Sequence, residues 1–431
     1  MTIRQIKAAS GLPPQAAQDT ADTVQVMLAR IRAGGEDAAR DYAQRLDGWD
    51  GPALVQPEAI ARACDAVPEG LKADIRYAHD NIRRFAEAQR ATLTEMEVEL
   101  RPGLFAGQRV IPVGSVGAYV PGGRYAHIAS ALMTIASARA AGVAQITACS
   151  PPRGDQGIPA PILYAMHLAG ADRILCMGGV QGVAAMAFGL FGGRPADILV
   201  GPGNQYVAEA KRQLFGPVGI DMVAGPTDSL ILADDSADAL TVAWDLVGQA
   251  EHGANSPVWL VASDAALAEA VMEHVPICIA ALPEPNRTAA RDAWEALGEV
   301  WVCDTPEDMA QKADEFAPEH LHVQARDLDW WQGRLRNYGS LFLGANTTVP
   351  FGDKAAGPNH VLPTSGAARH TGGLSVLKYL KTVTWQRVED RALPELARVS
   401  ASISRHEGME GHARSAEMRL PRPPSTLKAV G

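Results

Sequence analysis

The spacing of apolar residues divides the chain into a helical beginning and a long alternation of short strands and helices. Within residues 23–46 and 57–89, apolar side chains recur three and four positions apart, which predicts amphipathic helices. From about residue 103, short apolar runs alternate with Ala-rich helical stretches, as in RVIPVGSVGAYV followed by HIASALMTIASARAAG. This alternation is typical of βαβ units, so it predicts a mostly parallel sheet.

A second set of such units begins near residue 229, with SLILADDS and PVWLVASD as its first strands. The fold class is therefore predicted to be α/β with two parallel-rich sheets, the second of which takes part of its helices from the N-terminal region. The segment from about residue 375, beginning LSVLKYLKTVTWQRVED, is interpreted as separate helices. We expect four parts: an N-terminal arm (1–20), a first α/β domain (21–118 with 229–374), a second α/β domain (119–228) and a C-terminal helical tail (375–431).

Composition limits the class of function. With 431 residues, 47% of them hydrophobic, the chain can bury a large core. Its net charge of -10 provides no basic footprint, which disfavours nucleic acid or an anionic membrane as the main partner. No uncharged apolar run approaches the roughly 20 residues that span a bilayer, and the N-terminus lacks the apolar core of a signal peptide, so the cytoplasm is the expected location. The five cysteines lie far apart without CxxC pairing and are expected to be core residues.

Metal-capable and acid–base residues gather in four short strings of the C-terminal half, QAEHG, APEHLHV, FGDKAAGPNH and HEGMEGH. Zinc readily accepts histidine nitrogen and carboxylate oxygen, so a four-ligand site assembled from distant segments is chemically reasonable. A carboxylate and an imidazole would remain for proton transfer. Taken alone, each string also fits a solvated polar turn, and the Glu–His pair after Pro318 fits the start of a surface helix. The residues concerned are Gln249, His252, Glu319, His320, Asp353, Glu407 and His412.

Glycine-rich strings follow three of the predicted strands, although the GxGxxG fingerprint of dinucleotide binding is absent. They are YVPGGRY, MGGVQG and GPGNQYV. Small residues at the carboxyl ends of parallel strands allow a ligand to approach the backbone closely. Taken alone, each string is more typical of an ordinary turn, because Gly and Pro are common in turns of every kind.

The order and spacing of these strings carry a further signal. YVPGG, GPGNQYVAEAKRQLFGPVGIDMVAGP, QAEHG, PEHL, GSLFLG, GDKAAGPNHVLPT and EGMEGH resemble the histidinol dehydrogenase family, over residues from about Val24 to Met418. The resemblance implies two incomplete Rossmann-like domains, NAD bound without the usual glycine fingerprint, and zinc that orients a substrate between the two subunits of a homodimer. It also implies that an alcohol is oxidised twice, first to an aldehyde and then to an acid.

The same resemblance implies a role for each matching residue. Zinc would be held by Gln249, His252 and Asp353, with His412 coming from the partner chain. His320 would be the general base that takes the alcohol proton, and Glu319 would activate water for the second oxidation. The residues that match the family's cofactor contacts are Tyr119, Gln181 and Asn204, and the expected substrate contacts are Thr227, Gln249, His252, His320, Asp353, Lys354, His360, Glu407 and His412.

Departures from the family pattern bear on the substrate. Where GDY is usual, this chain has GDK with Lys354, and cationic residues also stand at Arg124 and Arg369. Because histidinol is itself a cation, this change favours an anionic substrate, with which each charge-assisted hydrogen bond contributes about 1.5 to 3 kcal/mol. TGGLSVLKYLKT further resembles the sulfopropanediol 3-dehydrogenase branch of the family. We therefore expect oxidation of 2,3-dihydroxypropane-1-sulfonate to 3-sulfolactate, with a drifted histidinol dehydrogenase and a catalytically silent binding homologue as the alternatives.

Overall fold

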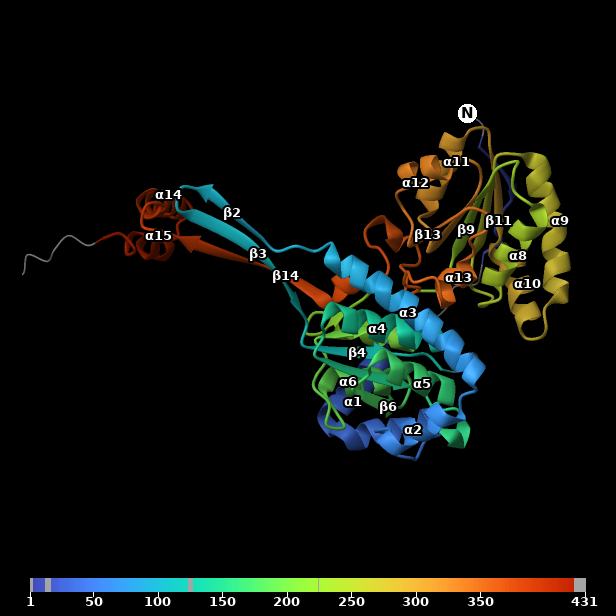
Figure 1. The fold of residues 1–431 in the computed structure, drawn as a ribbon, viewed down its shortest axis with the longest axis horizontal. Helices are drawn as coiled ribbons and strands as arrows, with labels where there is room; N and C mark the ends of the chain where they lie inside the picture. The colour runs from blue at the N-terminus through green and yellow to red at the C-terminus, as the bar shows by residue number, and fades with distance from the viewer. Residues whose placement is uncertain (1–2, 12–16, 123–126, 224, 422–431) are drawn as a thin grey trace, which may run out of the picture. The chain divides into compact units, whose positions relative to one another are not determined.

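The computed structural model describes residues 3–11, 17–122, 127–223 and 225–421. The chain has a mixed α/β fold with parallel-rich sheets, as its sequence predicts, and it divides into two compact units (Figure 1). The first unit comprises the described residues of Met1–Arg90 and Val113–Tyr379, and the second those of Ala91–Pro112 and Leu380–Gly431. No helix in the described ranges is long and apolar enough to cross a bilayer.

A five-stranded parallel sheet in the first unit has the order β6-β5-β4-β7-β8. The chain moves outward from β4 through β5 to β6 and then returns to the other side of β4 with β7 and β8. In such sheets the order of the strands reverses beside the first strand, and a crevice for ligands opens at its carboxyl end. The strands are β4 (Ser115–Tyr119), β5 (Gln145–Ser150), β6 (Arg173–Cys176), β7 (Ile198–Val200) and β8 (Gly219–Ile220).

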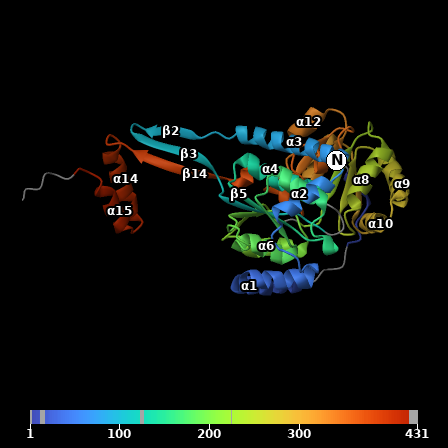
Figure 2. The same ribbon diagram turned by 60° about the horizontal axis from the view of Figure 1, so that its bottom comes forward.

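Helices cover both faces of this sheet, and the N-terminal helix α1 is among them. Val24, Met27, Leu28 and Ile31 form the buried side of α1 against α6 and α7, and Figure 2 shows α1 beside α6. We expected the N-terminal helices to support the other sheet; α1 and α2 instead pack on helices of this one, because helical periodicity marks an apolar face without specifying what covers it. The helices are α1 (Ala17–Tyr42), the π-helix η1 (Ala43–Asp47), α2 (Pro57–Ala66), α3 (Glu69–Ala91), α4 (Ile128–Ala141), η2 (Gly154–Gln156), α5 (Ala160–Ala169), α6 (Gly179–Phe188) and α7 (Gln205–Leu214).

A six-stranded sheet with the order β1-β11-β10-β9-β12-β13 forms the rest of the first unit's strand structure. Its neighbouring strands are parallel except β1, which pairs antiparallel with β11. Part of the expected N-terminal arm is therefore an edge strand. The strands are β1 (Ile3–Lys7), β9 (Ser229–Ala233), β10 (Val258–Ala262), β11 (Glu299–Cys303), β12 (His320–Gln324) and β13 (Ser340–Leu343).

Two hydrophobic clusters lie on the opposite faces of the six-stranded sheet. One packs α8 (Ala239–Ala250), α9 (Ala265–Ala281) and α10 (Asn286–Leu297) against the strands, and the other packs α11 (Pro306–Phe316) and α12 (Leu328–Arg334). Figure 1 shows these two layers on either side of β9 and β11. The short elements α13 (Val349–Lys354), η3 (Ala367–Arg369) and η4 (Val376–Tyr379) complete the unit. All five cysteines are free and four are buried, as expected for core residues.

The second unit is an antiparallel sheet of three strands with two helices. β2 (Met96–Arg101), β3 (Leu104–Pro112) and β14 (Leu380–Val388) have the order β14-β3-β2, and α14 (Leu393–His406) packs on α15 (Glu410–Glu417). The interpretation of residues 375–388 as helical was wrong beyond η4. β-Branched and aromatic residues favour a strand in TVTWQRV, and the ladder with β3 supplies its hydrogen bonds.

Candidate active site

The predicted acid–base pair lies at the amino edge of the six-stranded sheet. His320 begins β12, and its register partner Ser229 begins β9. Because α8 follows β9 and runs back antiparallel to it, the carboxyl end of α8 returns to this same edge with Gln249 and His252. Asp353 comes from the short helix α13. Segments far apart in the sequence therefore meet beside β12, where the Glu–His pair enters a strand and not the surface helix that was the alternative.

Hydrogen bonds fix the orientation of both members of the pair. Glu319 Oε2 accepts hydrogen bonds from Thr227 Oγ1 at 2.6 Å and from the backbone N–H of Asp228 at 3.1 Å. His320 Nδ1 lies 3.2 Å from the carbonyl oxygen of Asp228, which requires a proton on Nδ1. Nε2 of His320 is buried without a hydrogen-bond partner in the described structure, 3.5 Å from Asp353 Oδ1. In the neutral ring, Nε2 is therefore the basic nitrogen.

Burial and neighbouring charges shift the pKa values of this cluster. Burial is the main cause that raises the pKa of Glu319 to about 7, although His320 opposes it. Burial alone would lower the pKa of His320, but the carboxylates of Glu319 and Asp353 outweigh it and raise that pKa to about 9. Burial would raise the pKa of Asp353, and its interaction with His320 instead lowers it to about 2. Glu319 is thus a carboxyl group that titrates near neutral pH, as a general base requires.

Asp228 supports this arrangement, although the sequence analysis gave it no role. Its Oδ1 accepts a hydrogen bond from the backbone N–H of Glu319 at 2.6 Å, and Oδ2 accepts one from the N–H of Ser365 at 3.0 Å. Desolvation raises the pKa of this buried carboxyl. A carboxylate directly before the apolar run SLILA was the available signal, because a buried charge needs partners of its own.

A single chain provides three of the four predicted zinc ligands, and their surroundings show whether they could bind a metal ion. Among the described residues, no three His, Cys, Asp or Glu side chains form a group that would hold a metal ion by themselves. Of the predicted zinc ligands in the first unit, only His252 and Asp353 belong to these residue types. Its third member, Gln249, is 2% exposed, and its Oε1 is buried without a hydrogen-bond partner in the described structure. Gln249 stands three residues before His252, an imidazole that burial gives a lowered pKa and that lies within the electrostatic reach of Asp353. An unpaired buried acceptor in such surroundings fits a divalent cation.

His360 is expected to contact the substrate, and both nitrogens of its ring also lie within hydrogen-bond distance of protein atoms. Nδ1 lies 2.8 Å from the carbonyl oxygen of Asp353, and Nε2 lies 3.0 Å from Ser130 Oγ near the start of α4. This bridge connects α13 to the helix that follows β4. His127, the N-cap of α4, adjoins the same cluster, because His360 and His252 contribute, after burial, to lowering its pKa to about 4.

The three cationic residues proposed for the substrate anion differ in their surroundings. Lys354 is exposed at the end of α13, and its charge contributes, after desolvation, to the lowered pKa values of His252 and His360. Arg369 donates to the carbonyl oxygens of Gly366 and Glu315. Arg124 lies outside the described residues. Of the two that are described, Lys354 is the one that adjoins the cluster.

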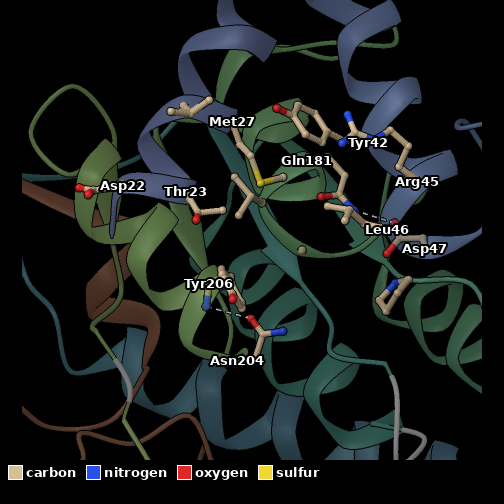
Figure 3. A pocket seen from close by; sticks show the side chains of 14 residues that line it. Asp22, Thr23, Met27, Tyr42, Arg45, Leu46, Asp47, Gln181, Asn204 and Tyr206 are labelled. Atoms are coloured by element: carbon tan, nitrogen blue, oxygen red, sulfur yellow. Dashed lines mark hydrogen bonds between the residues drawn. The ribbon is translucent and has the colours of Figure 1, made fainter. Parts of the chain in front are cut away.

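A pocket of about 850 Å³ lies at the carboxyl edge of the five-stranded sheet (Figure 3). Two of the predicted cofactor contacts, Gln181 and Asn204, line it. The third, Tyr119 at the end of β4, accepts a hydrogen bond from the Gly179 N–H at 3.1 Å through its hydroxyl oxygen. Val26, Met27 and Leu46 form part of the pocket's apolar wall, which sequence reasoning did not assign to it. The helix and π-helix that carry them lie far from the glycine-rich strings in the sequence.

The last two predicted site residues belong to the second compact unit. Glu407 is the C-cap of α14, and His412 lies in the first turn of α15. Both side chains are exposed. Their contribution to a site completed by a second copy of the chain remains a prediction.

Residues 12–420 match the family model described as histidinol dehydrogenase. The chain belongs to the histidinol dehydrogenase family. A crystal structure of histidinol dehydrogenase from Elizabethkingia anophelis is similar to it with a TM-score of 0.89 at 31% identity, over 95% of this chain and 94% of that one. The fold and its family are thereby established.

Two curated relatives from Ruegeria pomeroyi are similar over nearly their full lengths. A histidinol dehydrogenase homolog is 72% identical over all of both chains, and a sulfopropanediol 3-dehydrogenase is 60% identical over 97% of each. Histidinol dehydrogenases are dehydrogenases that act on CH–OH groups, so the family agrees with the acid–base chemistry of the cluster. The two relatives carry different names, so membership of the family does not by itself identify the substrate.

Proposed function

We propose that this protein is a zinc-assisted, NAD-dependent dehydrogenase that oxidises 2,3-dihydroxypropane-1-sulfonate through the aldehyde to 3-sulfolactate. The observation that carries the proposal is the buried pair of Glu319 and His320, held beside Asp353 with Nε2 of His320 unpartnered. The relative of 60% identity, named a sulfopropanediol 3-dehydrogenase, supports this choice of substrate.

In the first oxidation, Nε2 of His320 would take the hydroxyl proton of the substrate as NAD accepts the hydride. The contact of Nδ1 with the Asp228 carbonyl keeps Nε2 as the free base of the neutral ring. Gln249, His252 and Asp353, with the partner chain's copy of residue 412, would hold zinc. When bound, zinc would polarise the alcohol oxygen and neutralise the Asp353 carboxylate, which removes one of the two charges that favour protonated His320.

In the second oxidation, Glu319 would remove a proton from the water that attacks the aldehyde. The resulting hydrate would then give a hydride to a second NAD and a hydroxyl proton to a base, which leaves the carboxylic acid. A carboxyl group with a pKa of about 7 is a stronger base than an ordinary glutamate and is still ionised in an appreciable fraction at neutral pH. The hydrogen bonds to Oε2 hold the carboxylate in a single orientation.

Lys354 is the basis for proposing an anionic substrate. Its ammonium group is exposed beside the imidazole cluster, where it would meet the sulfonate, whereas the Arg369 guanidinium is already bonded to two backbone carbonyls. The same positive charge would repel histidinol, a cation. The proposed substrate class therefore rests on a lysine whose charge acts on the imidazoles of the cluster, and not on the catalytic pair.

We propose further that the active protein is a homodimer in which α15 completes the partner's zinc site. The second unit by itself is poorly covered, because every residue of β2 is exposed. Large apolar side chains are also exposed on its strands and helices, among them Leu100 at 59%, Ile403 at 55% and Met418 at 55%. Apolar side chains at this density are typical of a surface that another chain covers.

The deciding experiment measures NADH formation by the purified protein with three substrates: the sulfonated diol, histidinol, and propane-1,2-diol as the uncharged control. The expected result is a preference for the sulfonated diol, two NADH formed per molecule consumed, and loss of activity with a chelator that zinc restores. A preference for histidinol would establish the first alternative. NADH formation with none of these alcohols would leave a binding homologue and refute the proposal.

A further inference from the structure

The side-chain amide of Gln181 carries a buried acceptor without a partner. Gln181 lies in the first turn of α6 and is 1% exposed, and its Oε1 has no hydrogen-bond partner in the described structure. It lines the pocket at the carboxyl edge of the five-stranded sheet. Buried polar groups are nearly always hydrogen-bonded, so an orphaned oxygen in a pocket indicates a ligand that donates to it.

Asp47, the last residue of η1, determines which end of that amide is left unpaired. Its Oδ2 accepts a hydrogen bond from Gln181 Nε2 at 2.9 Å, and Figure 3 shows the amide nitrogen turned toward Asp47. An ionised carboxylate only accepts hydrogen bonds, so it selects the NH₂ end of the amide. The oxygen is consequently the end that remains for a ligand.

The same carboxylate occupies the start of α6. Asp47 Oδ2 also accepts the Gly178 N–H at 2.8 Å, and the hydroxyl of Tyr119 accepts the Gly179 N–H. In a glycine-rich phosphate-binding turn, such N–H groups would face the ligand's phosphates. Here two of them are used within the protein, and a negative charge already stands at the helix end. A pyrophosphate would be repelled at this position, which agrees with the absence of GxGxxG.

We propose that Asp47 is a positioning residue that holds the Gln181 amide with its oxygen toward the cofactor, so that Gln181 recognises an uncharged N–H or O–H donor of the dinucleotide. The donor is the carboxamide N–H, the adenine amine or a ribose hydroxyl. Asn204 has the complementary orientation, because its Oδ1 caps α7 and its amide nitrogen is the end left for a ligand. This inference rests on the proposed use of NAD.

The test compares NAD binding by isothermal titration calorimetry in the wild type, Asp47→Ala and Asp50→Ala. Asp47→Asn would not serve, because both hydrogen bonds end on Oδ2 and an amide oxygen in that position could keep them. Asp47→Ala removes the acceptor that holds Nε2, so the oxygen of the Gln181 amide is no longer fixed toward the ligand, and the Kd for NAD is expected to rise about 5- to 10-fold, the effect of one neutral hydrogen bond. Asp50→Ala removes a carboxylate three residues away, at an exposed residue outside this pocket, and is expected to change the Kd less than twofold.

A double-mutant comparison separates the effect on Gln181 from the anchoring of Gly178. In a Gln181→Leu background the amide is gone, so Asp47→Ala should change the Kd less than twofold. Effects that multiply fully would assign Asp47 a merely structural role and overturn the proposal. Dinucleotide analogues that each lack one candidate donor give a second readout. The wild type should bind one analogue about 5- to 10-fold more weakly than NAD, and Asp47→Ala should not discriminate against it.

Three further outcomes also overturn the inference: an Asp47→Ala variant that binds NAD as the wild type does, equal discrimination in both proteins, or a wild type that tolerates the loss of every donor. These outcomes differ from failure of the proposed function. A wild-type protein that binds and reduces NAD while Asp47→Ala does so equally well refutes only this inference. A wild-type protein that does not bind NAD refutes the proposed function as well.

Discussion

Replacing Glu319 by Gln is expected to stop the reaction at the aldehyde. The amide is nearly isosteric, and its oxygen can still accept the hydrogen bonds from Thr227 and from the Asp228 backbone. It cannot take a proton from water. The first oxidation relies on His320, and removal of the neighbouring negative charge lowers the pKa of that imidazole and so favours its basic form. Only the second oxidation should therefore be impaired.

The magnitude follows from the role and the environment of the carboxyl group. Loss of a positioned general base slows a step by about 100- to 10,000-fold, or about 3 to 5 kcal/mol in activation free energy. The pKa of Glu319 rises from 4.5 to about 7 on folding. At about 1.4 kcal/mol per pKa unit, ionising this carboxyl costs on the order of 3 kcal/mol more in the folded than in the unfolded protein.

This cost gives the pH dependence a definite sign. A carboxyl whose folded pKa is raised contributes stability that is complete below about pH 4.5 and is lost as the pH rises through about 7. The free energy of unfolding of the metal-free wild type should therefore fall between about pH 5 and pH 8, and that of Glu319→Gln should fall less. In the wild type the rate of aldehyde oxidation should rise through about pH 7 as Glu319 ionises.

The assay counts NADH formed per substrate molecule consumed and traps any released aldehyde with hydroxylamine. The expected ratio falls from two in the wild type to one in Glu319→Gln, with the trapped aldehyde as the second product. Glu315→Gln, a change of an exposed glutamate four residues earlier, is the matched control and should retain a ratio of two. Two NADH formed at the wild-type rate by Glu319→Gln would refute the assigned role.

Three further predictions concern other parts of the molecule. Lys354→Ala should lower kcat/KM for the sulfonated diol about 10- to 100-fold, the effect of one charge-assisted hydrogen bond, while Arg369→Ala changes it less than threefold; equal effects would exclude Lys354 as the anion contact. Gln249→Leu should reduce the zinc affinity of the purified protein at least tenfold by competition with a chromogenic chelator, and unchanged affinity would remove Gln249 from the ligand set. Lys211→Met should reduce the free energy of unfolding, measured in urea, by about 3 to 5 kcal/mol. Lys211 and Asp221 form a buried ion pair, and the change leaves the Asp221 carboxylate without its cation. A loss below about 1 kcal/mol would contradict this reasoning.

Much of the local structure could be predicted from the order of residue types. Apolar runs of strand length separated by Ala-rich stretches located the alternating strands and helices of both sheets, and the Glu–His and Gln–Ala–Glu–His strings supplied acid–base and metal-binding chemistry. Residues 380–388 were misassigned because an isolated segment with mixed periodicity fits a helix or a strand about equally. Its pairing with β3, whose residues lie about 280 positions earlier, decided the outcome.

By itself, the sequence determined which groups this protein can use in catalysis and which faces of its helices are apolar. Only the tertiary structure decided what those groups and faces meet: α1 against α6 and α7, Glu319 between Thr227 and Asp228, and the Gln181 amide turned by Asp47. The reason is that residue type and periodicity are local properties of the chain. Burial, the partner of a hydrogen bond and the pKa of a carboxyl depend on segments tens to hundreds of residues away, which only the folded chain brings together.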